Sequence, residues 1–259
     1  MKLRLLALTT ACALGLSGCA IIAPPKPNKP LQAVAESALN DSAGLAETDA
    51  SLSALRSEQA QALFAEIARL CGRNKEGATP PECVLPTADA TPSTGDAASL
   101  ATAAQEQILA QLDDFPKESL PRVFEVYTQL APYTAERDPG DVPTKDTKSV
   151  DGMRAWENSV IFGLDVALAF AGNATTDIEA AVEVHKEIAN ALPAGETPAP
   201  TSYDLSGYPD VSDTDSAREF MQAVQADSVK RWSISAAETK DPSWRKYALI
   251  QAGNVARFG

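Results

Sequence analysis

The chain contains a single histidine, His185, and this limits the chemistry that its side chains can perform. A catalytic triad of the Ser-His-Asp type needs a histidine as its base, so at most one such site could exist. The Gly-x-Ser-x-Gly, P-loop, dinucleotide-binding and His-Glu-x-x-His motifs do not occur in the sequence. We therefore expect a non-catalytic role for this protein.

Several polar residues fall on the apolar faces of four helices expected near the C-terminus. Glu157 lies among the apolar residues that recur at helical spacing between residues 149 and 171, and His185 interrupts the next helix in the same way. The third and fourth helices add three polar positions at a similar level, which are Asp227, Arg231 and Gln251. These five residues are predicted to lie together inside a helical bundle.

Two interpretations of this cluster are open. In the first, it is a buried hydrogen-bond network in which Glu157 pairs with His185 and Asp227 pairs with Arg231. Such pairing would remove the cost of burying polar groups without partners. In the second, Glu157, His185 and Asp227 hold a single metal ion. The first interpretation is the one we expect.

A second chemical feature lies at the N-terminus, where Leu16-Ser17-Gly18-Cys19 follows a basic start and a short apolar run. The pattern resembles the lipobox of bacterial lipoproteins. It predicts that residues 1–18 are a cleaved export signal rather than a membrane-spanning helix. The resemblance implies that Cys19 carries a diacylglycerol group and becomes the first residue of the mature protein. A cell-membrane location on the extracytoplasmic face follows from this prediction.

Residues 19–30 are rich in proline and are predicted to form a tether between the lipid and the folded chain. The whole chain has 22 basic and 35 acidic residues. Removal of residues 1–18 takes away Lys2 and Arg4, so the mature net charge is 20 − 35 = −15. This charge argues against nucleic acid as a partner and against electrostatic docking on acidic lipid. Membrane attachment is therefore expected to come from the lipid anchor.

Two cysteines, Cys71 and Cys83, remain in the mature chain besides Cys19. An even pair in an exported protein predicts a disulfide. The residues between them include glycine and two prolines, so the bridge would close a short loop. A metal-binding pair is the alternative, although no histidine or second cysteine pair lies nearby.

Helical periodicity extends over most of the chain, and no alternating strand pattern of useful length occurs. Residues 31–134 are predicted to form an N-terminal helical region, with a break near Gly44 and a low-complexity loop at 84–98. Residues 149–259 are predicted to form four further helices. Thr176 to Glu179 has the pattern of a capping box, and Asp241-Pro242 has that of an N-cap followed by proline. We therefore predict an all-α protein.

The connections between the last four helices are unequal in length. A short turn joins the first two and another joins the last two, whereas residues 193–212 form a long, proline-rich link. Two hairpins joined by one long crossover are typical of ferritin-like bundles.

The order of several short motifs in residues 149–258 resembles that of a ferritin-like domain family of unknown function from actinobacterial proteins. These motifs are Trp156-Glu157-Asn158, Phe162-Gly163, Val184-His185-Lys186, Tyr203-Asp204-Leu205 and Ser216-Ala217-Arg218. The family pattern has a histidine at the place of Asn158. A di-iron centre of this fold needs two Glu-x-x-His motifs, which a chain with one histidine cannot supply.

These observations together predict a membrane-anchored lipoprotein of the cell envelope that carries a ferritin-like helical bundle. A binding or scaffolding role is expected, with the membrane and a further envelope protein as partners. No cofactor is expected apart from the lipid on Cys19. The alternative is a metal-binding protein that uses iron or manganese for storage or redox chemistry on the same bundle.

Overall fold

The computed structural model describes residues 25–85, 90–143, 145, 147–194 and 203–258. The predicted signal segment 1–18 and the lipidation site Cys19 lie outside these residues. All regular secondary structure in the described part is helical, which confirms the predicted all-α class. Among the helices described there, none is both long and apolar enough to cross a membrane.

Eight α-helices and four short 3-10 helices make up this part of the chain. The α-helices are α1 (Lys29–Leu45), α2 (Ala50–Cys71), α3 (Ala97–Ala110), α4 (Leu120–Gln129), α5 (Thr147–Leu168), α6 (Thr175–Ala191), α7 (Thr214–Glu238) and α8 (Pro242–Ala256). The 3-10 helices are η1 (Pro81–Cys83), η2 (Lys117–Ser119), η3 (Ala131–Tyr133) and η4 (Gly172–Ala174).

Polar residues at the helix starts explain where several of the α-helices begin. The carboxylates of Asp49, Asp213 and Asp241 accept hydrogen bonds from the backbone at the starts of α2, α7 and α8. The predicted break after Gly44 and the predicted cap at Asp241 are therefore both present.

Two predicted boundaries differ from the structure. The predicted tether ends at residue 30, but α1 already begins at Lys29, because Asn28 caps it and Pro30 is compatible with a first helical turn. The predicted capping box at Thr176 is wrong, since α6 follows directly from η4 and its N-cap, Ala174, has no side chain that can accept a hydrogen bond. A capping box forms instead at the start of α7, between Asp213 and Ser216.

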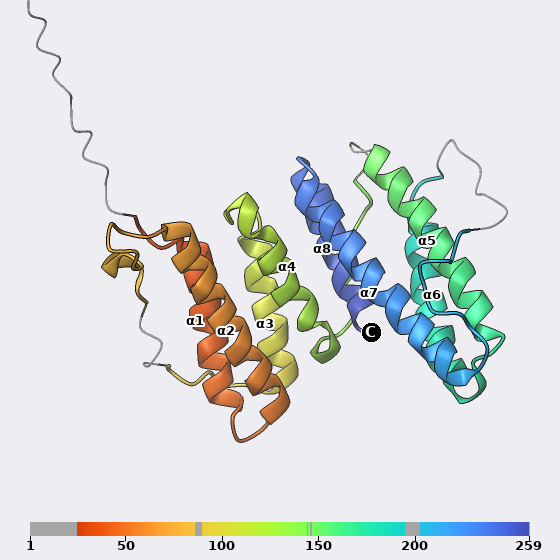
Figure 1. The fold of residues 1–259 in the computed structure, drawn as a ribbon, viewed down its shortest axis with the longest axis horizontal. Helices are drawn as coiled ribbons and strands as arrows, with labels where there is room; N and C mark the ends of the chain where they lie inside the picture. The colour runs from red at the N-terminus through yellow and green to blue at the C-terminus, as the bar shows by residue number, and fades with distance from the viewer. Residues whose placement is uncertain (1–24, 86–89, 144, 146, 195–202, 259) are drawn as a thin grey trace, which may run out of the picture.

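The helices pack as pairs that lie side by side along the long axis of the molecule (Figure 1). The order along this axis is α1–α2, α3–α4, α7–α8 and α5–α6. The spatial order of the pairs therefore differs from their order in the sequence. The pair α7–α8 lies between the N-terminal helices and α5–α6. It contacts α4 on one side and packs with α5 and α6 on the other.

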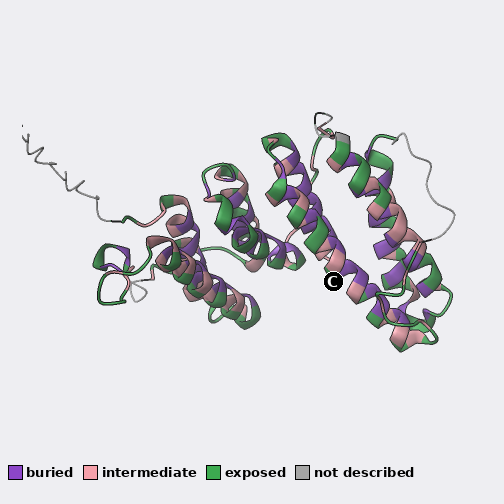
Figure 2. Ribbon diagram, turned by 45° about the horizontal axis from the view of Figure 1, so that its top comes forward, coloured by how far each residue is buried: buried purple, intermediate pink, exposed green. Residues whose placement is uncertain are grey.

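The buried apolar residues form two clusters. Figure 2 colours buried residues purple, and they lie mainly where neighbouring helices face one another. The larger cluster extends from α1 to α8 and joins the N-terminal helices to the C-terminal ones. The smaller cluster fills the far end of the α5–α7 packing. Gly253 of α8 allows a close approach to Tyr127 of α4, because a Cβ atom at this glycine would lie 2.8 Å from the tyrosine ring.

Candidate functional site: a buried polar network between α5, α6 and α7

Glu157 of α5 and His185 of α6 meet inside the four C-terminal helices. The Nδ1 atom of His185 lies 2.5 Å from Oε2 of Glu157. Both side chains are completely inaccessible to solvent. The short connection between α5 and α6 makes these helices neighbours, and this brings the two residues to the same depth. The first interpretation of the cluster predicted this contact.

Helix α7 supplies a second partner to each member of the pair. The indole Nε1 of Trp232 donates a hydrogen bond of 2.7 Å to Oε1 of Glu157. The amide Oε1 of Gln225 lies 2.8 Å from Nε2 of His185. Residues 225 and 232 are two helical turns apart, so their side chains share one face of α7. We refer to Glu157, His185, Gln225 and Trp232 as the buried network.

The arrangement of oxygens around His185 favours its protonated form. Both ring nitrogens face an oxygen acceptor, and an imidazolium can donate to both at once. Burial lowers the pKa of His185, but the charge of Glu157 and the hydrogen bonds to Glu157 and Gln225 together outweigh it and raise the pKa. The contacts of the buried network thus favour the protonated imidazole of His185.

One atom of the network has no partner. The amide nitrogen of Gln225 is buried and makes no hydrogen bond, whereas the oxygen of the same amide contacts His185. Rotating the amide by half a turn would leave its oxygen in the unpartnered position instead. The side chain therefore leaves one polar atom unsatisfied in either orientation, which costs about 1–3 kcal/mol.

Asp227 and Arg231 do not belong to this network, and their predicted pairing in the core is wrong. Asp227 is half-buried and accepts a hydrogen bond of 2.9 Å from the hydroxyl of Tyr208. Arg231 is exposed, and its guanidinium carbon lies 4.0 Å from the ring centroid of Trp156. No ion pair of the described residues joins the two. The buried face of α7 instead passes through Gln225, Ser228 and Trp232.

Gln251 is buried in α8, but its partners lie outside the network. Its amide nitrogen donates to the hydroxyl of Tyr247 at 3.1 Å, and its oxygen accepts from Asn254 at 3.4 Å. The Tyr247 ring packs against Trp232 and Trp244, with centroids 6.2 and 5.5 Å away. Gln251 therefore reaches Glu157 indirectly, through Tyr247 and Trp232.

The geometry leaves little scope for a metal ion at this level of the bundle. Both oxygens of Glu157 and both ring nitrogens of His185 already have hydrogen-bond partners. Asp227, the third ligand of the alternative interpretation, bonds to Tyr208 instead. No group of three or more His, Cys, Asp or Glu residues suitable for a metal occurs in the part of the chain that the structure describes. The donor set therefore fits a hydrogen-bond network better than a metal site.

Gln225 and Trp232 were not predicted as members of this network. Both lie on the buried face of α7 beside Val224 and Ser228, so helical spacing was the signal for them. A buried ion pair between the N-terminal helices was not predicted either. Arg56 of α2 donates to Asp41 of α1 at 2.7 Å through Nη2, and its Nη1 donates to Gln59 at 2.8 Å.

Cys71 and Cys83 are joined by a disulfide, as predicted, with Cα atoms 6.4 Å apart. The bond ties the end of α2 to η1 and closes the intervening loop. It lies in the N-terminal region, away from the buried network, so its role is to hold this loop against α2.

Comparisons of the chain with protein-family models, with curated protein sequences and with solved structures find no significant match. The resemblance to a ferritin-like family therefore stays a prediction, and the site has to be interpreted from its own geometry. That geometry is a closed network of one carboxylate, one imidazole, one amide and one indole, all without solvent exposure.

Proposed function

We propose that this protein is a lipid-anchored binding or scaffolding module of the cell envelope, built on a ferritin-like bundle that uses hydrogen bonds where a ferritin holds metal. The observation that carries the proposal is the engagement of every oxygen and nitrogen of the Glu157–His185 pair by protein partners. A buried pair whose own oxygens and nitrogens all have partners stabilises the bundle and offers no open position for chemistry.

The packing of the last four helices supports the ferritin-like part of this proposal. Helices α5 and α6 form one hairpin and α7 and α8 form another, with the long link 192–213 between them. The hydroxyl of Thr214 donates to the backbone oxygen of Phe170 at 3.4 Å, so the start of α7 lies beside the end of α5. Helix α5 packs on α7 and α6 packs on α8, as in a bundle with one crossover.

The lipid anchor is tested by membrane fractionation of the Cys19→Ala variant. We expect this variant to move from the membrane to the soluble fraction, because its acylation site is lost. Cys12→Ala is the matched control, since Cys12 lies in the predicted signal segment and its loss should leave attachment unchanged. Retention of the Cys19→Ala chain at the membrane by acyl-independent contacts would contradict the proposal.

The network is tested against the metal alternative by elemental analysis of protein purified without chelators. We expect substoichiometric iron and manganese, and no change in the amount bound when His185 is replaced by Ala. Near-stoichiometric metal that disappears in the His185→Ala variant would support a storage or redox role instead.

A further inference from the structure

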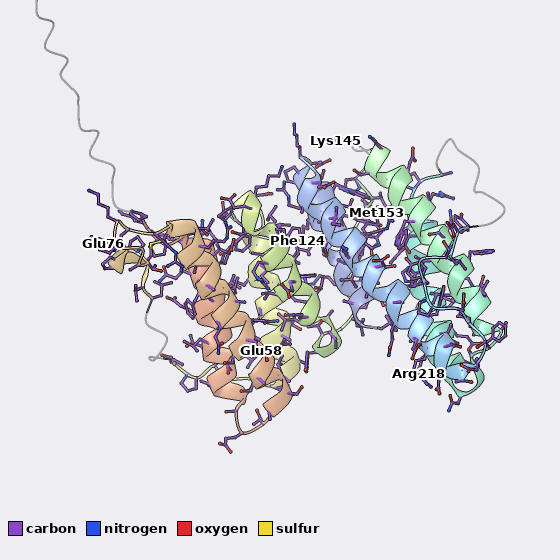
Figure 3. All side chains as sticks on the ribbon, in the orientation of Figure 1. Glu58, Glu76, Phe124, Lys145, Met153 and Arg218 are labelled. Atoms are coloured by element: carbon purple, nitrogen blue, oxygen red, sulfur yellow. A yellow bond between two sulfur atoms is a disulfide. The ribbon has the colours of Figure 1, made fainter. Side chains whose placement is uncertain are left out.

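The outer face of α7 borders an open pocket of about 950 Å³ on the side of α5. The first turns of α5 form one wall, and the second half of α7 with the residues that follow it forms the other. Met153, which is labelled in Figure 3, lies on the α5 wall close to α7. Pockets of this size are in the range used for small-molecule ligands.

Positive charge predominates in the lining of this pocket. Four exposed cationic side chains face two carboxylates, and the six residues are Lys148, Lys230, Arg231, Lys240, Asp227 and Glu238. None of the four cations belongs to an ion pair of the described residues. Asp227 already accepts a hydrogen bond from Tyr208. The pocket is thus a locally positive site on a chain whose net charge is −13.

The helix ends beside the pocket do not decide whether its electrostatic potential is positive or negative. The start of α5 contributes positive partial charge and the end of α7 contributes negative partial charge, so the two effects oppose each other. The side chains therefore decide the electrostatic preference, and they favour an anion.

A second pocket of about 430 Å³ lies on the other side of α7, towards α4. Five of its nine lining residues are apolar, and they include Pro121 from α4 and Val229, Ile234 and Ala237 from α7. Glu125, whose carboxylate pairs with Arg122, also lines it. Lys230 and Ile234 line both pockets, so the two are neighbours across a single turn of α7. Ile234 is one of the few large apolar side chains that the described residues expose, at 43% of its surface.

We propose that these two pockets form one binding site for an acidic lipid. The acidic headgroup would occupy the cationic pocket between α5 and α7, and an acyl chain would cross Ile234 into the apolar pocket between α7 and α4. A neutral apolar molecule would leave the four cations unused, and a small anion would leave the apolar pocket unfilled. The inference gives a ligand class to the binding role proposed above and rests on that role, but it does not depend on the lipid anchor.

The acidic net charge of the protein is compatible with this site. It opposes adsorption of the whole molecule to an acidic surface, but such long-range repulsion is screened within about 8 Å at physiological ionic strength. Contacts inside the pocket act over shorter distances, and there the local excess of cations determines the interaction.

The test measures binding of soluble, short-chain lipids to the full chain carrying Cys19→Ala, which removes the acylation site. The probes are dihexanoyl phosphatidylglycerol, dihexanoyl phosphatidylcholine and glycerol phosphate, and binding is followed by titration calorimetry. We expect the acidic lipid to bind and the other two to bind at least about tenfold more weakly. The phosphatidylcholine has no net negative charge, and glycerol phosphate has no acyl chain.

Three further variants of this chain locate the site. Lys148→Glu combined with Lys230→Glu reverses one charge on each wall and should weaken binding of the acidic lipid by about tenfold or more. Ile234→Ser should weaken it through loss of apolar contact. The matched control, Lys246→Glu, changes an exposed lysine of α8 that lines neither pocket, and it should bind like the parent chain.

Equal binding of the two lipids, or parental affinity in the Lys148/Lys230 and Ile234 variants, would overturn the inference. Equally tight binding of glycerol phosphate would show an anion site without a lipid chain and would also overturn it. Failure of the proposed envelope role is seen separately, in the fractionation of Cys19→Ala and in the metal analysis.

Discussion

The Nδ1 atom of His185 and the Oε2 atom of Glu157 lie 2.5 Å apart in a region that no solvent reaches. A charged pair at this depth is stable only if its remaining donors and acceptors are also satisfied. Gln225 and Trp232 of α7 provide these contacts, so the pair ties the α5–α6 hairpin to α7. The stability of the C-terminal helices should therefore depend strongly on each contact.

Removal of the Glu157 carboxylate should strongly destabilise the fold. We expect Glu157→Ala to lower the free energy of unfolding by about 3–5 kcal/mol, because His185 and Trp232 would be left buried without their partner. Chemical denaturation followed by circular dichroism measures this change. Glu183→Ala on the exposed face of α6 is the control and should have little effect. Similar losses in both variants would contradict a special role for Glu157.

The raised pKa of His185 predicts a pH dependence of stability. The folded protein holds the imidazole proton more tightly than the unfolded chain does, where the pKa has its ordinary value of 6.5. The stabilisation is therefore complete below pH 6.5 and is lost as the pH rises through the pKa of the folded state. No other side chain of the sequence has an ordinary pKa near neutrality, since His185 is the only histidine.

The Glu157→Gln variant isolates this effect. Its amide can still bond to Trp232 and His185, but the charge that raises the pKa of His185 is removed. We expect denaturation midpoints of the parent protein to fall as the pH rises above 6.5, and those of Glu157→Gln to change much less. Parallel profiles for the two proteins would show that His185 is neutral in the fold.

The indole contact of Trp232 can be separated from its packing. Trp232→Phe keeps an aromatic ring but loses the hydrogen bond to a carboxylate, which should cost about 1.5–3 kcal/mol beyond the change in ring size. Trp244→Phe is the matched control, because Trp244 is equally buried but donates to the neutral hydroxyl of Ser235. Thermal denaturation should show the larger loss for Trp232→Phe. Equal losses would contradict a charge-assisted bond.

The buried pair of Asp41 and Arg56 predicts a non-additive response between α1 and α2. Asp41→Ala should cost about 3–5 kcal/mol, because it leaves the guanidinium of Arg56 buried without its charge partner. Adding Arg56→Met should recover part of this loss. Urea denaturation of both variants measures the coupling, and Arg122→Ala, which breaks an exposed pair with Glu125, should change little. An additive double variant would contradict a direct pair.

The approach of α8 to α4 at Gly253 predicts opposite effects of the same substitution at two glycines. Gly253→Ala should lower stability by about 1–3 kcal/mol, since its Cβ would lie 2.8 Å from the buried ring of Tyr127. Gly152→Ala in α5 meets nothing within 4 Å and should raise stability by about 0.5–1 kcal/mol through helix propensity. Thermal midpoints of the two variants check this difference. A stabilising effect at Gly253 would show that the helices can separate at little cost.

Sequence reasoning was most successful where local rules apply. Helical periodicity predicted the helical class, and Asp241-Pro242 predicted the start of α8. The same periodicity placed Glu157 and His185 on inward faces, because α5 and α6 each have one well-defined buried side.

The same reasoning failed along α7. The buried residues of this helix recur every three or four positions and turn slowly around its axis, so that they pass through Gln225, Ser228 and Trp232. A stripe extended from Phe220 predicted that Asp227 and Arg231 are inside, whereas Gln225 and Trp232 occupy the interior. The spacing of Val224, Ser228 and Trp232 indicated this direction, but the sequence does not show which groups Gln225 and Trp232 contact, because those groups lie on other helices.

The sequence by itself determined the helical class, the cap at Asp241 and the single histidine that limits the chemistry. These features depend on residue type and on neighbours a few positions away. Only the tertiary structure decided that α7–α8 lies between the two halves, that Trp232 and Gln225 complete the Glu157–His185 pair, and that a cationic pocket adjoins an apolar one. The physical reason is that hydrogen-bond partners and pocket walls are set by distances between helices that are remote in the chain.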